Sequence, residues 1–327
     1  MRLYEELEII VQEETQSCSA AVQAGAMSAF REWFNREGEA EGQFCREVRT
    51  RIRDGLEKRE RGPARQALHR VSERFAMRQL LDAKKAQSNR RYVERTAQEN
   101  GRVLEFVRQK RKGVVFFGTA RSEPGETEYE RARELSRETA GLLPDSTIWN
   151  GAGPGDMDAI TRGAKEGGGA VGGIKIRLSE TQSAFEQKVS SAFDAGEVVE
   201  CDYFHPRKVG LADAAARENE SERTALICLP GGFGTMDEFY EVATLMQLKI
   251  IGKAYPFPML LMNYNGEYDG IIAFMERAAC DGRLTEKELA VVRICTSNRE
   301  ALDALADFYK IPKEQRTYAQ RLRDWNE

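Results

Sequence analysis

The sequence predicts an α/β protein in which a Rossmann-like, doubly wound and mostly parallel sheet follows an N-terminal α-helical region. The first observation is that short apolar runs alternate with helical patterns from Gly113 onward, which is typical of βαβ units. The second is that residues 1–112 contain a single proline and are rich in Glu, Arg, Gln and Ala, which favour helices. We therefore expect a helical domain or oligomerisation arm at 1–112 and a Rossmann-like domain at 113–327.

The helical region shows apolar residues at helical spacing, as in Leu3, Leu7 and Ile10. Arg61-Gly62-Pro63 predicts a turn between helices, because proline suits the first position of a helix. Acidic residues separate most of the basic ones. This region is therefore expected to serve assembly or partner binding rather than nucleic-acid binding.

The second region alternates strands with helices. Strands are predicted at Val114–Phe117, Thr147–Trp149, Ala170–Ile176, Val198–Phe204, Ala225–Leu229, Pro258–Met262 and Val291–Cys295. Helices are predicted at Glu126–Leu142, Met157–Lys165, Glu238–Leu248 and Tyr268–Ala279. Because ligands of such sheets bind beyond the carboxyl ends of the strands, the loops that follow strands are the places to search for a site.

Composition narrows the classes of function. The net charge is only −4, which favours neither a nucleic acid nor a membrane surface as a partner. The six cysteines are scattered and only two histidines accompany them, so we expect reduced thiols and no metal site. Acidic residues near the start and the lack of a long apolar run argue against a signal peptide and a membrane span. We expect a cytoplasmic protein without a cofactor.

Three loops after predicted strands are rich in glycine. They are Phe117–Arg121, Asn150–Asp158 and Leu229–Glu238. No Gly-Lys-Ser/Thr follows any of them, and the spacing of Gly151, Gly153 and Gly155 does not fit GxGxxG. The loops therefore do not predict a nucleoside triphosphate or dinucleotide site.

The third loop predicts a phosphate site. It runs from a buried strand into a helix and carries Gly231, Gly232 and Gly234. We expect these glycines to adopt left-handed backbone angles that turn their N–H groups toward one point. The positive end of the helix dipole adds to the attraction for an anion. Phe233 and Thr235 complete the predicted phosphate-binding turn, with Thr235 adding a hydroxyl.

Glu238 has two interpretations at this stage. Thr235-x-x-Glu238 matches a capping box, in which the carboxylate would only cap the helix. Alternatively, the carboxylate takes part in chemistry beside the bound phosphate. Because Asp237, Glu238 and Glu241 repel an anion, we favour a task for at least one of them.

Four motifs in order resemble the LOG family, the cytokinin riboside 5′-monophosphate phosphoribohydrolases and related nucleotide nucleosidases. The string Pro230–Glu238, PGGFGTMDE, resembles the family signature PGGxGTxxE. Tyr203–Lys208 resembles the Arg-Lys motif, Asn150–Ala164 resembles a TGGGPGIMEAANRGA-like loop, and Asp237–Gln247 resembles the DE-aromatic-x-E…Q helix of longer members. The resemblance covers about residues 113–310 and says little about the first 112.

The resemblance implies a Rossmann-like domain that hydrolyses the N-glycosidic bond of a nucleoside 5′-monophosphate, with AMP or a cytokinin riboside monophosphate as substrate. It also implies at least a homodimer and catalytic roles for Arg207 and Glu238. Further substrate contacts are expected from the other motif loops. These are Gly118, Thr119, Arg121, Gly151, Gly153, Met157, Asp158, Lys208 and Glu241.

Two points stay open in the sequence. Ala152, Asp156 and Asp158 stand where the family pattern has Gly, Ile and Glu, which leaves the preferred base undefined. Asp158 and Glu241 are alternative donors of a proton to the leaving base. The competing function is a nucleotide- or molybdenum-cofactor-binding carrier of the same fold that performs no hydrolysis.

Overall fold

The computed structural model describes residues 89–177, 189–323 and 325. The chain divides into two compact units, Met1–Val93 and Glu94–Glu327. Nearly all of the first unit, including the predicted turn at Pro63, lies outside the described residues. Residues 89–110 are helical. Residues 94–112, which the sequence assigned to the helical region, belong to the second unit, where Val103 and Val107 are fully buried.

Within the described residues, one seven-stranded sheet has the order β4-β3-β2-β1-β5-β6-β7, and every pairing is parallel. The strands are β1 (Gly113–Phe117), β2 (Thr147–Asn150), β3 (Val171–Ile176), β4 (Val198–Cys201), β5 (Ala225–Cys228), β6 (Met259–Met262) and β7 (Val292–Cys295). The doubly wound α/β fold predicted from the sequence is confirmed, and each predicted strand overlaps an observed one.

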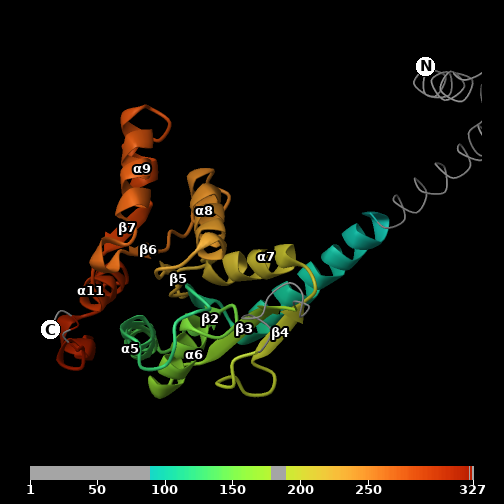
Figure 1. Ribbon diagram of the computed structural model, residues 1–327, viewed down its shortest axis with the longest axis horizontal. Coiled ribbons are helices and arrows are strands. Elements are labelled where there is room, and N and C mark those ends of the chain that lie inside the picture. Colours follow the sequence, from blue (N-terminus) through green and yellow to red (C-terminus); the bar gives the residue numbers. More distant parts are fainter. Residues whose placement is uncertain (1–88, 178–188, 324, 326–327) are drawn as a thin grey trace, which may run out of the picture. The chain divides into compact units, whose positions relative to one another are not determined.

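Helices cover both faces of the sheet (Figure 1). They are α5 (Thr127–Leu142), α6 (Asp156–Glu166), α7 (Phe204–Ala215), α8 (Phe233–Gln247), α9 (Asp269–Cys280), α10 (Glu286–Leu289) and α11 (Asn298–Phe308), with 3₁₀ turns at Tyr264–Gly266, Lys313–Gln315 and Thr317–Gln320. Alternate residues of a strand point to opposite faces. Val114 and Phe116 therefore pack on the face covered by α5, α6 and α11, whereas Val115 and Phe117 pack beneath α7, α8 and α9.

Two predicted boundaries are wrong near the site. The predicted strand Val198–Phe204 ends at Cys201, and Phe204 instead begins α7, with Pro206 in the first turn, where a missing N–H costs little. Helix α8 begins at Phe233 rather than at Glu238, because the glycine-rich segment already takes up helical geometry. The Arg-Lys motif therefore lies on a helix, and Glu238 lies in the second turn of α8.

The topological switch point lies between β1 and β5. The chain moves outward from β1 to β4 on one side and then returns to place β5 on the other side of β1. Phe117 pairs with Cys228 at the carboxyl ends of these strands, so the turns that follow them start at the same level. Open α/β sheets bind ligands at this position. No helix in the described ranges is long and apolar enough to cross a membrane.

Candidate active site

The turn between β5 and α8 presents an open helix N-terminus. Gly232 is the N-cap of α8 and receives no side-chain cap, and residues 232–234 are exposed. A Cβ atom added at Gly232 or Gly234 would meet nothing within 4 Å. The first N–H groups of a helix lack intrahelical acceptors, so this space suits a phosphate.

The expected left-handed angles of this turn are wrong. None of Gly231, Gly232 and Gly234 has a positive φ. Gly231 is needed for space instead, because a Cβ there would lie 2.2 Å from the Thr235 hydroxyl oxygen. The glycines allow close approach of the chain and of a ligand rather than an unusual backbone conformation.

Thr235 fastens the turn to the end of β1. Its hydroxyl donates a hydrogen bond to the carbonyl oxygen of Gly118, with an Oγ1–O distance of 2.9 Å. Thr235 is the third residue of α8 and not its N-cap, so the capping-box interpretation of Thr235 and Glu238 is wrong. The Glu238 carboxylate is not used to close the helix end.

Arg207 and Glu238 form a buried ion pair between α7 and α8. Nη2 of Arg207 lies 3.2 Å from Oε1 of Glu238, and the residues are only 8% and 5% exposed. The guanidinium also lies over the ring of Phe204, 5.4 Å from its centroid. Its Nε–H is buried and has no hydrogen-bond acceptor in the described part of the chain. The pair therefore contains a buried donor that no described residue satisfies.

The loop after β2 approaches this ion pair. A Cβ on Gly151 would lie 2.3 Å from Nη2 of Arg207, so only glycine lets the guanidinium reach this position. Gly153 lies against Met157, whose sulfur accepts a hydrogen bond from the Gly153 N–H at 3.3 Å. The structure thus brings the motif segments Asn150–Ala164, Tyr203–Lys208 and Pro230–Glu238 together around Arg207.

Lys175 lies beside the loop after β2 and was not singled out by the sequence analysis. It is 3% exposed on β3, and its ammonium lies 3.4 Å from the Cβ position of Gly153. A lysine inside the otherwise apolar strand Val171–Ile176 is the signal that would have indicated it, because lysine is rarely buried without a partner.

Asp158 lies in a separate network with α5 and α6. Its carboxylate accepts hydrogen bonds from Arg162 and Ser190, at 2.7 and 2.5 Å, and from Tyr129. Although burial acts in the opposite direction, these bonds hold the pKa of Asp158 below its ordinary value. A carboxylate with these partners is unsuited to donate a proton to a leaving base.

Lys208 and Glu241 face each other on the outer side of α7 and α8. The Lys208 ammonium lies 2.9 Å from Asp237 and 3.2 Å from Glu241. Burial alone would lower the pKa of Lys208, but the hydrogen bonds to both carboxylates raise it. Lys208 and Glu241 thus form a bridge between the two helices, and their contacts with a substrate stay a prediction.

Asp156 anchors the turn after β1, where Thr119 and Arg121 lie. Its carboxylate accepts hydrogen bonds from the Thr119 N–H at 3.0 Å and the Ser122 hydroxyl at 2.5 Å. The Thr119 carbonyl in turn accepts from the Asp156 N–H at 2.9 Å, and Arg121 remains exposed at the end of the turn. Burial raises the pKa of Asp156 to about 6, although the bonds from Ser122 and Thr119 act to lower it.

The raised pKa of Asp156 predicts a pH-dependent stability. The contribution of this group is fully present below its unfolded pKa of 3.8 and is lost as the pH rises through about 6. From this group alone, the wild type should be about 1.4 kcal/mol more stable at pH 5 than at pH 7.5. In Asp156→Asn this difference should disappear, whereas the exposed control Asp281→Asn should retain it. Urea unfolding at both pH values measures the effect, and an unchanged difference in Asp156→Asn would contradict the assignment.

The similarity of the family profile to this chain lies in the second unit. The family profile described as possible lysine decarboxylase matches residues 157–305. A probable cytokinin riboside 5′-monophosphate phosphoribohydrolase of Oryza sativa subsp. japonica is 31% identical over 172 residues, which cover 53% of this chain and 67% of that protein. A cytokinin riboside 5′-monophosphate phosphoribohydrolase of Rhodococcoides fascians is 29% identical over 158 residues, covering 48% of this chain and 71% of that protein.

Solved structures with a similar fold include two proteins that are named for carrying or binding the molybdenum cofactor. The molybdenum cofactor carrier protein of Chlamydomonas reinhardtii has a TM-score of 0.41 at 18% identity, covering 61% of this chain and 99% of that chain. The molybdenum cofactor binding protein of Rippkaea orientalis has a TM-score of 0.38 at 18% identity, covering 61% and 98%.

The identity to the rice protein extends over two thirds of that relative, and the motif segments that predicted the resemblance meet at one edge of the sheet. The chain belongs to the LOG family, whose named members here are cytokinin riboside 5′-monophosphate phosphoribohydrolases.

Proposed function

We propose that the protein hydrolyses the N-glycosidic bond of a nucleoside 5′-monophosphate to a free base and ribose 5-phosphate. The observation that carries this proposal is the buried Arg207–Glu238 ion pair, which lies one helical turn beyond the open N-terminus of α8. In this proposal the helix N-terminus binds the 5-phosphate, and the carboxylate one turn further along the helix faces the anomeric carbon of the same ribose. Relatives in the family are named for the same reaction on cytokinin riboside monophosphates.

In this proposal the phosphate is bound but does not react. The N–H groups of Gly232, Phe233 and Gly234 bind it at the helix N-terminus, where the helix dipole favours an anion. Its binding energy positions the sugar for chemistry at the other end. Nucleosides without the phosphate should therefore be poor substrates.

Glu238 acts at the anomeric carbon. Cleavage of a ribosyl–base bond passes through an oxocarbenium-like state with positive charge on the sugar. The carboxylate stabilises this charge and removes a proton from the attacking water as the new C–O bond forms and the C–N bond breaks. Arg207 orients the carboxylate through the ion pair, and in this proposal its guanidinium also binds a ribose hydroxyl or a phosphate oxygen of the substrate.

The departing base leaves with a proton that neither Asp158 nor Glu241 is placed to supply. Asp158 lies in its network with Arg162 and Tyr129, and Glu241 is paired with Lys208. In this proposal a solvent water supplies this proton, and the hydroxide that remains is neutralised by the proton that Glu238 took from the attacking water. AMP and the cytokinin riboside monophosphates remain the candidate substrates.

Substitution of Glu238 tests the reaction. Incubation with a panel of nucleoside monophosphates should release free base and ribose 5-phosphate from at least one, as followed by chromatography. Glu238→Gln should lower kcat by roughly 100-fold to 10,000-fold, the range for loss of a general base, while nucleotide binding remains measurable by calorimetry.

The matched control is Asp237→Asn, which changes the neighbouring, half-exposed carboxylate of α8. It should retain most of the wild-type kcat. Full activity in Glu238→Gln would remove the proposed role of this residue. Binding without base release by the wild-type protein on every nucleotide would instead favour a carrier of nucleotide or molybdenum cofactor.

We also propose that the protein acts as a homodimer or higher homo-oligomer through the exposed side of α8. Phe233 is 98% exposed, and a shallow, mainly apolar groove continues along the same helix past Met236, Tyr240 and Leu245. Exposed apolar surface of this kind is typical of protein interfaces. The groove lies on the helix that carries Glu238, so a second copy would border the site.

Substitution at the start of α8 tests the assembly. Phe233→Asp should shift the protein toward the monomer in sedimentation velocity, because it places a charge in the apolar contact. Phe274→Asp, on α9 and also exposed, is the matched control and should leave the sedimentation coefficient unchanged. A wild-type protein that is monomeric at micromolar concentration would contradict this proposal.

A further inference from the structure

A basic cavity, separate from the candidate active site, lies beyond the carboxyl ends of β6 and β7. Its volume is 280 Å³, and its walls include Arg131 of α5, Arg299 of α11, Arg323 of the C-terminal segment and the rings of Tyr264 and Trp325. The remaining lining residues are uncharged, and no Asp or Glu of the described chain lines it. Three cations therefore border one small space without an acidic residue in its wall.

Arg131 is the most deeply buried of these cations. It is 5% exposed, and its guanidinium lies between the rings of Tyr264 and Trp325, 5.1 and 5.9 Å from their centroids. Nη2 donates to the Trp325 carbonyl oxygen at 3.0 Å. Among the described residues, no carboxylate forms an ion pair with Arg131 within 4 Å. An anion bound in the cavity would therefore lie beside a buried guanidinium that no carboxylate of the described residues pairs with.

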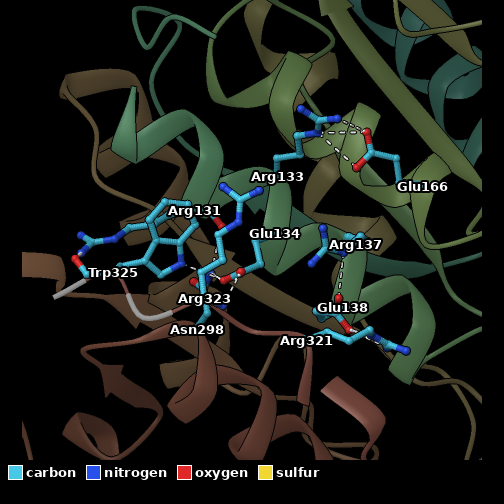
Figure 2. A network of polar contacts seen from close by, with 10 residues as sticks. All are labelled: Arg131, Arg133, Glu134, Arg137, Glu138, Glu166, Asn298, Arg321, Arg323 and Trp325. Atoms are coloured by element: carbon cyan, nitrogen blue, oxygen red, sulfur yellow. Dashed lines mark hydrogen bonds and ion pairs between the residues drawn. The ribbon is translucent and has the colours of Figure 1, made fainter. Parts of the chain in front are cut away.

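The buried carboxylate of Glu134, which lies on α5 as Arg131 does, accepts three hydrogen bonds (Figure 2). It accepts hydrogen bonds from the Asn298 amide, the Arg323 N–H and the Trp325 indole N–H, each at 2.8 Å. These bonds tie α5, α11 and the C-terminal segment together. Glu134 therefore holds the walls of the cavity together.

Helix α11 points its N-terminus into the same cavity. Asn298 and Arg299 are its first two residues and both line the space. Their N–H groups are among those that a helix leaves without an intrahelical acceptor. The N-cap Ser297 accepts from the Glu300 N–H at 3.3 Å, and the Glu300 carboxylate is bonded to Thr296. The dipole of an 11-residue helix adds to the attraction for an anion.

We propose that this cavity binds a phosphate group, supplied by inorganic phosphate or by a small phosphomonoester, at a site separate from the Gly231–Thr235 turn. Arginine guanidinium groups and helix N–H groups are the donors that phosphate binding sites use. The volume lies just below the range of about 300–1,000 Å³ for drug-sized ligands, so a phosphate or a sugar phosphate fits better than a larger nucleotide. This site does not depend on the proposed reaction.

The test compares two double variants that remove the same charge. Arg299→Gln with Arg323→Gln removes two exposed cations from the cavity wall without altering Arg131. Arg108→Gln with Arg283→Gln removes two exposed arginines elsewhere, whose ion pairs within the described residues are with Glu105 and Asp281. Calorimetric titration at constant ionic strength uses inorganic phosphate in one arm and ribose 5-phosphate in the other.

The cavity double variant should lose one phosphate site or bind it at least about tenfold more weakly, while the control double variant matches the wild type. Tighter binding of ribose 5-phosphate than of phosphate would assign the ligand as a sugar phosphate, and equal binding would assign phosphate alone. Identical stoichiometry and affinity in both double variants would overturn the site. The cavity double variant should still release the base. A failure of the proposed phosphate site is therefore distinguishable from a failure of the proposed reaction.

Discussion

The buried ion pair between Arg207 and Glu238 is the interaction on which the candidate site depends. It joins α7, which follows the edge strand β4, to α8, which follows the central strand β5. Two charges so deeply buried are retained only when each has a partner, because removing one leaves the other uncompensated at a cost of about 3–5 kcal/mol. The close approach at Gly151 serves the same pair, since no other residue leaves room for the guanidinium.

The turns around this pair are joined to one another rather than held independently. The Thr235 hydroxyl bonds the start of α8 to Gly118, and Asp156 bonds the next residues of the same turn to α6. The loops after the adjacent strands β2, β1 and β5 therefore share hydrogen bonds at the carboxyl edge of the sheet. Such coupling preorganises a binding site, because the donors need not be reordered when a ligand arrives. It also explains how a buried carboxyl group at Asp156 is tolerated next to the site.

The sequence predicted the sheet well because each strand is a short apolar run between polar segments, as in Ala225–Cys228. The sequence did not predict helix α7, because small and charged residues alternate around Pro206 without a clear apolar stripe. It also placed the start of α8 too late, because Gly232 and Gly234 are typical of turns although the structure makes them helical or capping.

The residues of the site were predictable only where a contiguous motif carries them. Arg207, Glu238 and the glycine turn lie in such motifs, and the structure places them together. The anchoring role of Asp156 and the position of Lys175 depend on contacts between distant segments. The same holds for the basic cavity, since Arg131, Arg299 and Arg323 come from three separate parts of the chain. No local pattern reports contacts of this kind.

The central claim is that the turn binds the phosphate while Glu238 faces the anomeric carbon of the same sugar. A crystal structure with ribose 5-phosphate bound tests it most directly. The account predicts phosphate oxygens within about 3 Å of the N–H groups of Gly232–Gly234, with C1 of the ribose directed toward the Glu238 carboxylate. A sugar bound with its phosphate away from this turn, or with C1 directed away from Glu238, would contradict the account.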